Sequence, residues 1–548
     1  MDSKKVMSGL QIDLDSIPDQ NTRIIIRHLL NVIEAQAEEI NQLKEEVQRL
    51  RDENNHLKGE QGQPKIRKQS QPSEDISSEN ERKNRDNKQP GKHKKAKKKK
   101  LVIHKVERRV VDKSQLPADA VFKGYHSTVT QDIRIAPYNI RFDCEVYYSS
   151  SLNKSIIAPL PDGYDGDFAP GLKALILDMH HQEEMTESAI HRFLTTHGID
   201  ISTASISRIV TDKHESFHQE KRDIVSAGLQ STIHQQMDDT GARVNGKNHY
   251  MHILCNDYYT AYFTRKDKTR LTIIDILSQG DVMFHFNECT YSLMEQMEMS
   301  DKMLSKLKAT NPKPVMSRKE VDVFLKELLP MSSIQQTNRQ LILDTSAIVG
   351  YQSRPDAIKV LLTDDAPQFK QITELLALCW VHDGRHYKKL SPVVPLHRTL
   401  LEMFLTQYWD YYHDLLQYKE TPSATLAEIL SLQFDTLFST VTGYQQLDER
   451  IRKTKNKKEE LLLVLQYPGL PLHNNTSELG ARKQARYRDI SFHTVSEKGT
   501  EANDTFKTII QTAKKLGVNS YRYLCERISN TLQMPSLAEM ILNKANTC

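Results

Sequence analysis

The most regular hydrophobic pattern in the chain lies close to its N-terminus, where apolar residues recur in alternating steps of three and four. The core positions of this heptad repeat are Ile26, Ile33, Ile40, Val47 and Asn54 in one row and Leu29, Gln36, Leu43, Leu50 and Leu57 in the other. β-Branched residues in the first row with leucine in the second favour two parallel helices, and a core asparagine fixes their register. The pattern predicts a coiled-coil dimerisation helix over residues 23–60, preceded by an N-terminal tail over residues 1–22.

The charges that flank this repeat favour a parallel homodimer. The position before the first core row holds Glu39, Glu46 and Glu53, and the position after the second core row holds Lys44, Arg51 and Lys58. In a parallel, in-register pair of helices these opposite charges lie next to each other across the interface. We therefore expect a homodimer through this helix.

Residues 61–100 form a polar linker that becomes strongly basic. Between residues 81 and 115, fifteen lysines and arginines stand against four aspartates and glutamates, with the highest density in GKHKKAKKKK at 91–100. Like charges cannot collapse into a core, so the segment should be solvated. Two interpretations stay open: a solubilising tail, and a sequence-independent grip on DNA phosphates, for which Lys97 and Lys98 are candidates.

The next two regions are predicted to be ordered. Alternating apolar positions predict a small β-rich region over 101–170, and helical spacing follows over 171–230. Within the second region, MTESAIHRFLTTHGIDISTASISRIV at 185–210 predicts two helices joined by a turn at Gly198, the second capped by Ser202 or Thr203. This outline fits a DNA-binding helix-turn-helix, whose exposed Ser205 and Arg208 would face a groove, and it equally fits an ordinary helical corner.

Two predicted strands end in paired acids. HQQMDDTG at 234–241 carries Asp238 and Asp239, and IKVLLTDDAPQF at 358–369 carries Asp364 and Asp365. Carboxylates at the ends of neighbouring strands can converge without being buried in the core, and together they could hold Mg²⁺, which prefers oxygen ligands. Each aspartate alone is more often a strand-end or turn-capping residue, and the chain has 71 acidic residues. The pattern therefore needs further context.

A third acid precedes a run of bases in NNTSELGARKQARYRD, residues 474–489. Glu478 lies ahead of Arg482, Lys483, Arg486 and Arg488 on a predicted helix. The simplest interpretation is a surface ion pair between Glu478 and Arg482, which stabilises a helix by roughly 0.3–0.5 kcal/mol. The alternative is a metal-binding carboxylate beside a track for DNA phosphates.

Composition narrows the class of protein. With 548 residues and 38% hydrophobic content, the chain can bury more than one core. Its six cysteines lie far apart and form no CxxC pair, so they predict neither a disulfide framework nor a zinc site. No run of residues is typical of a signal peptide or a membrane span. We therefore expect a cytoplasmic protein.

Four segments, in this order, resemble the motifs of the insertion sequence 66 family of bacterial transposases, which belong to the DDE superfamily. They are MDDTGARV at 237–244, LLTDDAPQF at 361–369, ALCWVHDGRHY at 377–387 and LPLHNNTSELGARKQARYRD at 470–489. The resemblance implies an α/β, RNase H-like catalytic core, a mixed sheet flanked by helices, over residues 231–530. The sequence predicts all-helical insertions at about 281–340 and 394–465, and the resemblance implies such an insertion between the second and third acids. A C-terminal tail follows over 531–548.

The same resemblance implies a chemistry. Asp238, Asp364 and Glu478 would be the catalytic acids and would bind two Mg²⁺ ions, for which Mn²⁺ can substitute. Water would attack the phosphodiester at each transposon end, and the freed 3′-hydroxyl would attack target DNA. Secondary candidates around these acids are Asp239, Asp365, His382, Arg385, Asn474 and Asn475. Cys379 and His382 have a C-x-x-H spacing, but without a second such pair a buried structural element explains it better than a metal site, and no zinc is predicted.

The chain departs from the family pattern at two positions near the third acid. His473 stands where relatives usually have Asp, and Leu479 follows Glu478 where they usually have Arg. The first change would alter hydrogen bonding near the site. The second removes a contact to a phosphate or an acid, unless Arg482 supplies it.

The resemblance implies double-stranded DNA as partner, both at the transposon ends and at the target, and a location in the cytoplasm at the bacterial nucleoid. Whether accessory transposition proteins take part stays open. Two other functions stay open. One is a DNA-binding regulator descended from a transposase, in which the acids are only structural. The other is a coiled-coil assembly protein without a DNA role. Metal-dependent cutting of DNA, and DNA binding that weakens steeply with salt, distinguish the three.

Overall fold

A computed structural model describes residues 14, 16–57, 102–112, 116–117, 119–133, 135–329, 333–490 and 493–547. The predicted linker over 61–100, with the candidates Lys97 and Lys98, lies outside these residues. The described residues divide into two units: the smaller one contains those between 102 and 141 together with 192–201, and the larger one contains the others. Among the described residues, no helix combines the length and the apolar character that crossing a membrane requires.

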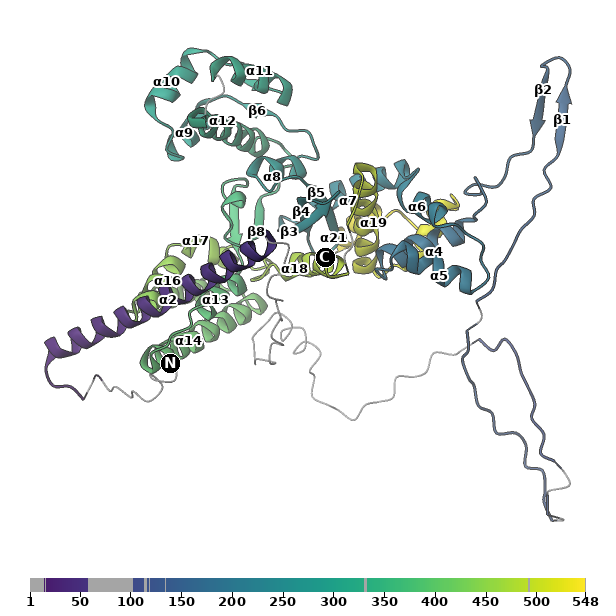
Figure 1. The fold of residues 1–548 in the computed structure, drawn as a ribbon, viewed down its shortest axis with the longest axis horizontal. Helices are drawn as coiled ribbons and strands as arrows, with labels where there is room; N and C mark the ends of the chain where they lie inside the picture. Colours follow the sequence, from purple (N-terminus) through teal and green to yellow (C-terminus); the bar gives the residue numbers. More distant parts are fainter. Residues whose placement is uncertain are drawn as a thin grey trace. The chain divides into compact units, whose positions relative to one another are not determined.

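The larger unit is built on a mixed five-stranded sheet, so the predicted α/β class is confirmed (Figure 1). Its strands, in spatial order, are β5 (Thr260–Arg265), β4 (Lys247–Cys255), β3 (His234–Val244), β8 (Val360–Thr363) and β9 (Leu375–Leu378). β4 runs antiparallel to both β3 and β5, whereas β8 runs parallel to β3 and β9 runs parallel to β8. Asn245 and Gly246 join β3 to β4 with positive φ angles of 46° and 72°, as a tight hairpin turn requires.

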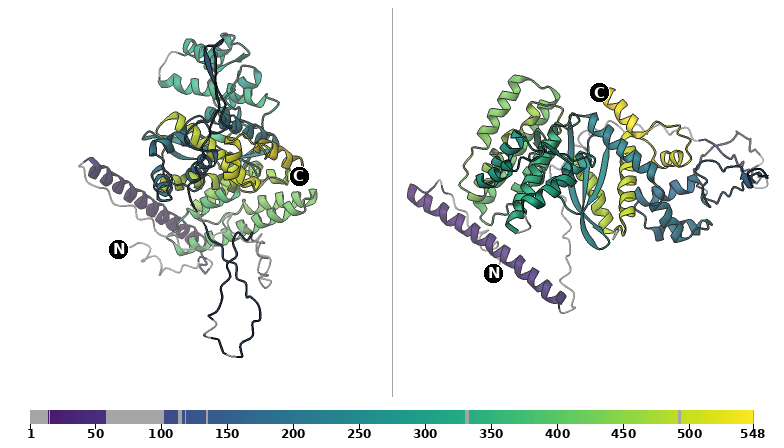
Figure 2. Two further views of the ribbon diagram at one scale, coloured as in Figure 1. Left: turned by 90° about the vertical axis from the view of Figure 1, so that its right-hand side faces the viewer. Right: turned by 90° about the horizontal axis from the view of Figure 1, so that it is seen from above.

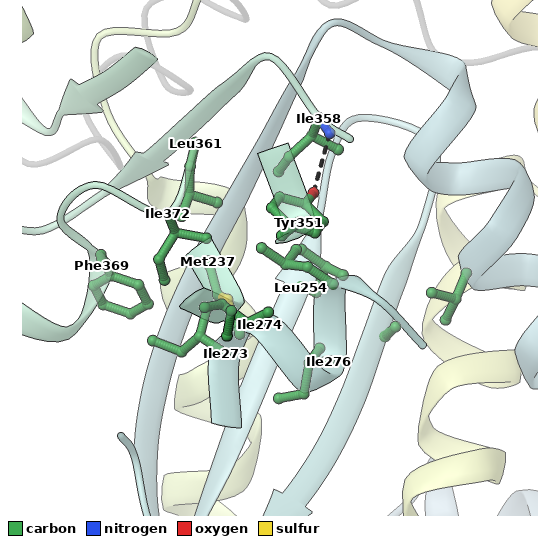
Figure 3. Close-up of a cluster of buried hydrophobic side chains, with 14 of the residues drawn as sticks. Met237, Leu254, Ile273, Ile274, Ile276, Tyr351, Ile358, Leu361, Phe369 and Ile372 are labelled. Carbon is green, nitrogen blue, oxygen red and sulfur yellow. Dashed lines mark hydrogen bonds between the residues drawn. The ribbon is translucent and has the colours of Figure 1, made fainter. Parts of the chain in front are cut away.

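One face of the sheet carries the main hydrophobic core (Figure 3). Met237, Leu254 and Leu361 of three neighbouring strands point to this face, where they meet α8 (Arg270–Leu277) and α12 (Ser333–Gln352). The other members of the cluster that Figure 3 labels are Ile273, Ile274, Ile276, Tyr351, Ile358, Phe369 and Ile372. The Tyr351 hydroxyl also accepts a hydrogen bond from the Ile358 amide at 3.0 Å, which ties α12 to the start of β8.

The opposite face is covered by α18 (Asn475–Asp489) and by the segment 461–470. Ile253 packs near Ala481 of α18, while Val360 and Leu362 pack on Leu463 and Leu470. Side chains alternate between the faces of a strand. Residues of β3 and β8 that share the orientation of Leu362 therefore point towards α18 and its surroundings.

The edge strand β5 is covered by α19 (Glu497–Leu516). Three side chains at successive turns of α19 accept hydrogen bonds from β5 amides: Thr512 from Thr260 at 3.2 Å, Thr508 from Tyr262 at 3.1 Å and Asp504 from Thr264 at 2.6 Å. Exposed amides on an edge strand invite unwanted pairing. The helix therefore protects this edge. The helices that surround α19 are α4 (Pro170–His181), α6 (Thr203–Thr211), α7 (Glu215–Ser231), α20 (Ser520–Ile528) and α21 (Leu537–Thr547).

Two insertions interrupt the sheet. The first contains α9 (Glu288–Gln296), α10 (Asp301–Ala309) and α11 (Arg318–Leu328), but also the short paired strands β6 (Phe284–His285) and β7 (Val315–Met316). The prediction that this insertion is all-helical is therefore wrong, because Phe284 and Met316 pair through their backbones and both are buried.

The second insertion is entirely helical over its described residues (Figure 2). It follows α13 (Trp380–Lys388), and its elements are α14 (Pro395–Glu420), α15 (Ala424–Leu437), α16 (Gln445–Lys455), α17 (Lys458–Leu461) and the 3₁₀ turn η3 (Leu463–Leu465). The aromatic residues of α14, which are Phe404, Tyr408, Trp409, Tyr411, Tyr412 and Tyr418, are buried. Tyr408 and Tyr411 pack against Trp380 with ring centroids 5.6 Å apart, so these rings form a core and are not free to stack on bases.

The remaining elements are peripheral to the sheet. The predicted coiled-coil segment is one long helix, α2 (Gln20–Leu57). Among the described residues of 101–170, the only strands are β1 (Val146–Ser149) and β2 (Lys154–Ile157), which form an antiparallel pair. The predicted helix-turn-helix stretch consists of α5 (Glu187–Thr196) and α6.

Candidate active site

Asp238 and Asp364 come to neighbouring positions on two adjacent strands of the sheet. Asp364 directly follows the end of β8, as predicted. The prediction that the first strand ends at its acids is wrong, because β3 pairs with β4 beyond Asp238 as far as Val244. In the parallel pair of β3 and β8, Gln236 lies opposite Leu362. Asp238 and Asp364 each follow two residues later, so they share the orientation of Leu362. Both aspartates therefore point to the face that α18 covers.

The two carboxylates lie in a partly buried, negatively charged environment. Burial raises the pKa of Asp238 to about 7, helped by the charges of Asp364, Asp239 and Glu478 and opposed by a hydrogen bond from the Asp239 amide at 2.8 Å. Burial also raises the pKa of Asp364, whereas a bond from the Ala366 amide at 3.2 Å acts in the other direction. Uncompensated negative charge held on oxygen atoms is the environment that a hard divalent cation relieves.

The second acid of each pair is neutralised by lysine. Asp239 lies next to Asp238 in β3 and so points to the opposite face, where Lys268 approaches to 3.3 Å and the Gln368 amide donates at 3.0 Å. Asp365 lies 2.6 Å from Lys457 and 3.2 Å from Lys370. Although burial acts to raise it, the pKa of Asp365 is lowered by these two lysines. Asp239 and Asp365 are thus occupied by protein cations, unlike Asp238 and Asp364.

Glu478 lies in the first turn of α18 and is almost fully buried. Arg385 of α13 donates to Glu478 Oε2 at 3.0 Å and, through its other terminal nitrogen, to His382 Nε2 at 3.0 Å. Burial lowers the pKa of His382, which favours the neutral imidazole. Because Nε2 accepts from Arg385, the guanidinium is the main charge partner of Glu478. The predicted partner Arg482 is more distant, at 3.9 Å.

A glycine lets α18 approach the sheet closely at this point. A Cβ atom added to Gly480 would lie 2.8 Å from Ile253 Cγ2, closer than van der Waals contact allows. Gly480 is two residues after Glu478, so the closeness of helix and sheet at Ile253 also brings the first turn of α18 towards the aspartates.

The helix α13 links the site to the second insertion. Its residues His382 and Arg385 contact Glu478, whereas the buried Asp383 forms an ion pair with Arg450 and accepts from Thr454 Oγ1 at 2.8 Å. Lys457 lies 3.7 Å from Asp383 and also binds Asp365. Sequence reasoning missed Asp383, Arg450 and Lys457, because isolated charges on helices carry no local signal of their partners.

Other polar groups gather around His382. Both amide atoms of the buried Asn474 lack a hydrogen-bond partner among the residues that the structure describes. Cys379, His382 and Glu478 each offer one ligand atom within 4.8 Å of the others, which is close enough to share a metal ion. A pocket of about 310 Å³ adjoins this group and is lined by Asp364, Asp365, Cys379, His382, Asp383 and Lys457 among others. The predicted candidate Asn475 is buried in the first turn of α18.

The basic residues that follow Glu478 divide into two sets. Arg482, Arg486 and Arg488 are exposed. Lys483 is different, because its ammonium group donates to the Gln182 carbonyl at 3.1 Å and lies 3.9 Å from Glu184. Burial lowers the pKa of Lys483. The structure therefore places Lys483 in an internal contact and leaves the three arginines accessible.

The predicted groove-facing residues lie on α6. Ser202 caps this helix by accepting from the Ser205 amide at 3.1 Å, as expected. Ser205 is half-buried, and Arg208, whose guanidinium lies 3.4 Å from the Ser205 hydroxyl, is exposed. The buried Ile206 and Val210 lie on the opposite side of α6, which packs on α4 and α19.

Comparisons with known proteins agree with the motif order. A family model described as "Transposase IS66 family" matches residues 165–287 and 355–502. The chain is also 30% identical over 327 residues to the uncharacterized protein y4jO of Sinorhizobium fredii, an alignment that covers 59% of this chain and 100% of that relative. The family match includes both acid pairs, α13 and α18, and omits residues 288–354, which contain most of the first insertion.

Proposed function

The chain belongs to the IS66 transposase family, and from this premise we propose that it binds transposon ends and performs metal-dependent 3′-end cleavage and strand transfer. The observation that carries the proposal is the register of β3 and β8, which puts Asp238 and Asp364 at adjacent positions on the face covered by the Glu478 helix. The strand order, with three antiparallel strands followed by two parallel ones, supports an RNase H-like core.

Asp238, Asp364 and Glu478 would hold the metal ions. The raised pKa values of the two aspartates fit this role, because a nearby divalent cation would stabilise their ionised forms. When bound, a pair of Mg²⁺ ions, or of Mn²⁺ ions, would supply the charge that activates the attacking oxygen and stabilises the leaving oxygen. Arg385 and His382 would orient Glu478, and the lysines on Asp239 and Asp365 would keep those acids out of the metal site.

Substrate DNA would be held by the exposed bases near this site. Arg482 and Arg486 lie one helical turn apart on α18 and are both exposed, so they can contact consecutive phosphates. Arg488 is the third exposed base of this helix. Ser205 and Arg208 remain candidates for reading end sequence, which requires contacts to base edges. We further propose that α2 joins two copies, so that two active sites act on two ends.

The test is cleavage of end DNA by purified full-length protein in the presence of Mg²⁺. Asp238→Asn and Asp364→Asn should reduce cleavage by more than about 100-fold, beyond the usual effect of a residue that only supports a metal ligand. Arg385→Ala, which leaves the acids in place, should lose roughly 10–100-fold. Asp322→Asn on α11, outside the family match, is the matched control and should cleave normally.

Each variant is also tested for binding to the same DNA. Retained binding with lost cleavage supports the proposal. Normal cleavage by Asp238→Asn and Asp364→Asn would refute the assignment of the acids. DNA binding by the unsubstituted protein without any metal-dependent cleavage would instead favour a transposase-derived regulator.

A further inference from the structure

One side of the N-terminal half of α2 contacts the second insertion and the residues just ahead of it (Figure 2). Leu30 is buried against Val393 and Val394, just ahead of α14. Ile26, Ile33 and Ala37 pack on the same small cluster. These spacings of three and four residues are those of a single helix face.

Polar contacts make this docking specific. The carboxylate of Glu34, only 4% exposed, accepts from the Val393 amide at 3.0 Å and the Val394 amide at 2.7 Å, and lies 3.3 Å from His397 Nδ1. Free amides at the start of a helix favour a negative partner. Burial acts to raise the pKa of Glu34, but these hydrogen bonds outweigh it and lower the pKa.

Asn31 adds a second anchor beside Glu34. Its side-chain amide donates to the Gly443 carbonyl at 3.0 Å and accepts from the Gln445 amide at 3.1 Å, at the start of α16. The N-terminal half of α2 is therefore held by the beginnings of two helices of the second insertion.

This docking conflicts with the heptad register that the sequence suggests. In that register Ile26 and Ile33 belong to the core of the dimer. In the structure both side chains pack instead on the cluster of Leu30, Val393 and Val394. A second helix cannot cover the same side chains while α2 stays docked.

A different apolar stripe remains exposed along the whole of α2. Its members are Ile25, Leu29, Val32, Ile40, Leu43, Val47 and Leu50, each more than a third exposed. With the exposed Gln36 included, they follow one another at steps of four, three, four, four, three, four and three residues. The two consecutive steps of four are a stutter, which a coiled coil accommodates by local unwinding. The stripe includes Ile25 and Val32 in place of Ile26 and Ile33.

We propose that a second copy of the chain covers this exposed stripe. The dimer interface then runs through Ile25, Leu29, Val32 and Ile40, while Ile26 and Ile33 keep their contacts with Val393 and Val394 of their own chain. The inference rests on the proposed homodimer. The flanking charges indicate that the partner is a second copy of the same helix. Glu39 and Glu46 lie on one side of the stripe and Lys44 and Arg51 lie on the other, so opposite charges meet when two copies pack in parallel. Each α2 helix of the dimer is then held by the second insertion of its own chain, which α13 links to the candidate site.

The test is disulfide cross-linking of full-length protein under mild oxidation, with the unsubstituted chain as reference for its native cysteines. Only core positions bring two Cβ atoms close enough for a disulfide. Val32→Cys and Ile33→Cys are adjacent and distinguish the two registers, and Leu50→Cys lies in the core of both. We expect efficient cross-linking at positions 32 and 50 and at least about tenfold less at 33.

The outcomes separate the inference from the homodimer on which it rests. Cross-linking at 33 and 50 but not at 32 would overturn the inference and restore the heptad register, with the dimer intact. No cross-linking at 50, together with a monomer in sedimentation, would remove the dimer itself.

A second variant tests the docking. In Glu34→Ala the helix should be released, and Ile33→Cys should then cross-link more than in the parent chain. Glu45→Gln, an exposed glutamate on the outer side of the helix, is the matched control and should leave the pattern unchanged. If Ile33→Cys cross-links as poorly with Glu34→Ala as without it, the Glu34 contacts do not determine the interface.

Discussion

Charge is distributed unevenly over the acids of the candidate site. Glu478 has an arginine at hydrogen-bonding distance, and Asp239 and Asp365 have lysines. Among the described residues, no ion pair involves Asp238 or Asp364, and the pKa values of both are raised. These two carboxylates therefore contribute repulsion to the folded protein, which is a cost that a functional site can carry.

The raised pKa of Asp238 predicts a pH-dependent effect on stability. Its folded-state pKa is about 7, above the ordinary value of 3.8, so the folded state binds more protons than the unfolded state between these pH values. The contribution of protonated Asp238 to the free energy of unfolding is therefore fully present below about pH 4 and is lost as the pH rises through about 7. Asp238→Asn should therefore stabilise the metal-free protein more at pH 8 than at pH 4.

Urea unfolding in EDTA at the two pH values measures this difference. Because asparagine does not titrate, the gain should approach zero at the lower pH. Added Mg²⁺ should stabilise the unsubstituted protein at pH 8 and have a smaller effect on Asp238→Asn. Asp322→Asn provides the reference, since its carboxylate pairs with Arg318 on an exposed surface. An equal gain at both pH values would contradict the assigned cause.

At the level of elements, the site depends on how closely α18 lies on the sheet. The helix contacts β3 and β4, and Gly480 is the residue that meets Ile253. An alanine there would favour the isolated helix by about 1 kcal/mol. In the folded protein the added methyl group has no space, and forcing extra volume into a packed contact typically costs about 1–3 kcal/mol.

Gly480→Ala should therefore lower stability by up to about 2 kcal/mol, and should reduce end cleavage because the first turn of α18 carries Glu478. Denaturant unfolding and the cleavage assay measure the two effects. Gly171→Ala on α4, where the nearest atom to an added Cβ is the Tyr521 hydroxyl at 3.4 Å, should be tolerated. Equal stability and equal cleavage in the two variants would show that the close contact between α18 and the sheet is not required for the site.

At the level of the whole molecule, the proposed roles in catalysis and in DNA binding fall on different surfaces of one helix. The first turn of α18 faces the aspartates, and the arginines further along are exposed, whereas Lys483 is held by Gln182 and Glu184. The first insertion lies mostly outside the family match, and so is an addition to the part that the family shares.

DNA binding should weaken steeply with salt, and the slope reports phosphate contacts. Each lost contact reduces the slope of log affinity against log salt by roughly one. Arg482→Ala with Arg486→Ala should therefore flatten the slope by up to about two. Lys483→Ala should leave the slope unchanged and lower stability instead, because its ammonium group binds within the protein. A slope change at Lys483 as large as that at the arginines would contradict this division.

Much of this protein could be predicted from short-range patterns. The short strand before Asp364, the helix that carries Glu478 and the long N-terminal helix are all visible in the spacing of apolar and charged residues. The end of β3 is not, because this strand continues past Asp238 and Asp239 by pairing with β4. The all-helical first insertion was predicted wrongly, because β6 and β7 have only two residues each and exist only through their pairing.

By itself, the sequence determined the α/β class, the order of the motifs and the existence of α2, because each depends on residues close together in the chain. Only the tertiary structure decided which aspartate of each pair faces α18, because that depends on the register between β3 and β8. It also decided that Arg385, 93 residues before Glu478, is the partner of this acid. Likewise, whether Ile33 or its neighbour Val32 is free to meet a second chain depends on the side of α2 that Glu34 anchors, and that contact spans 359 residues.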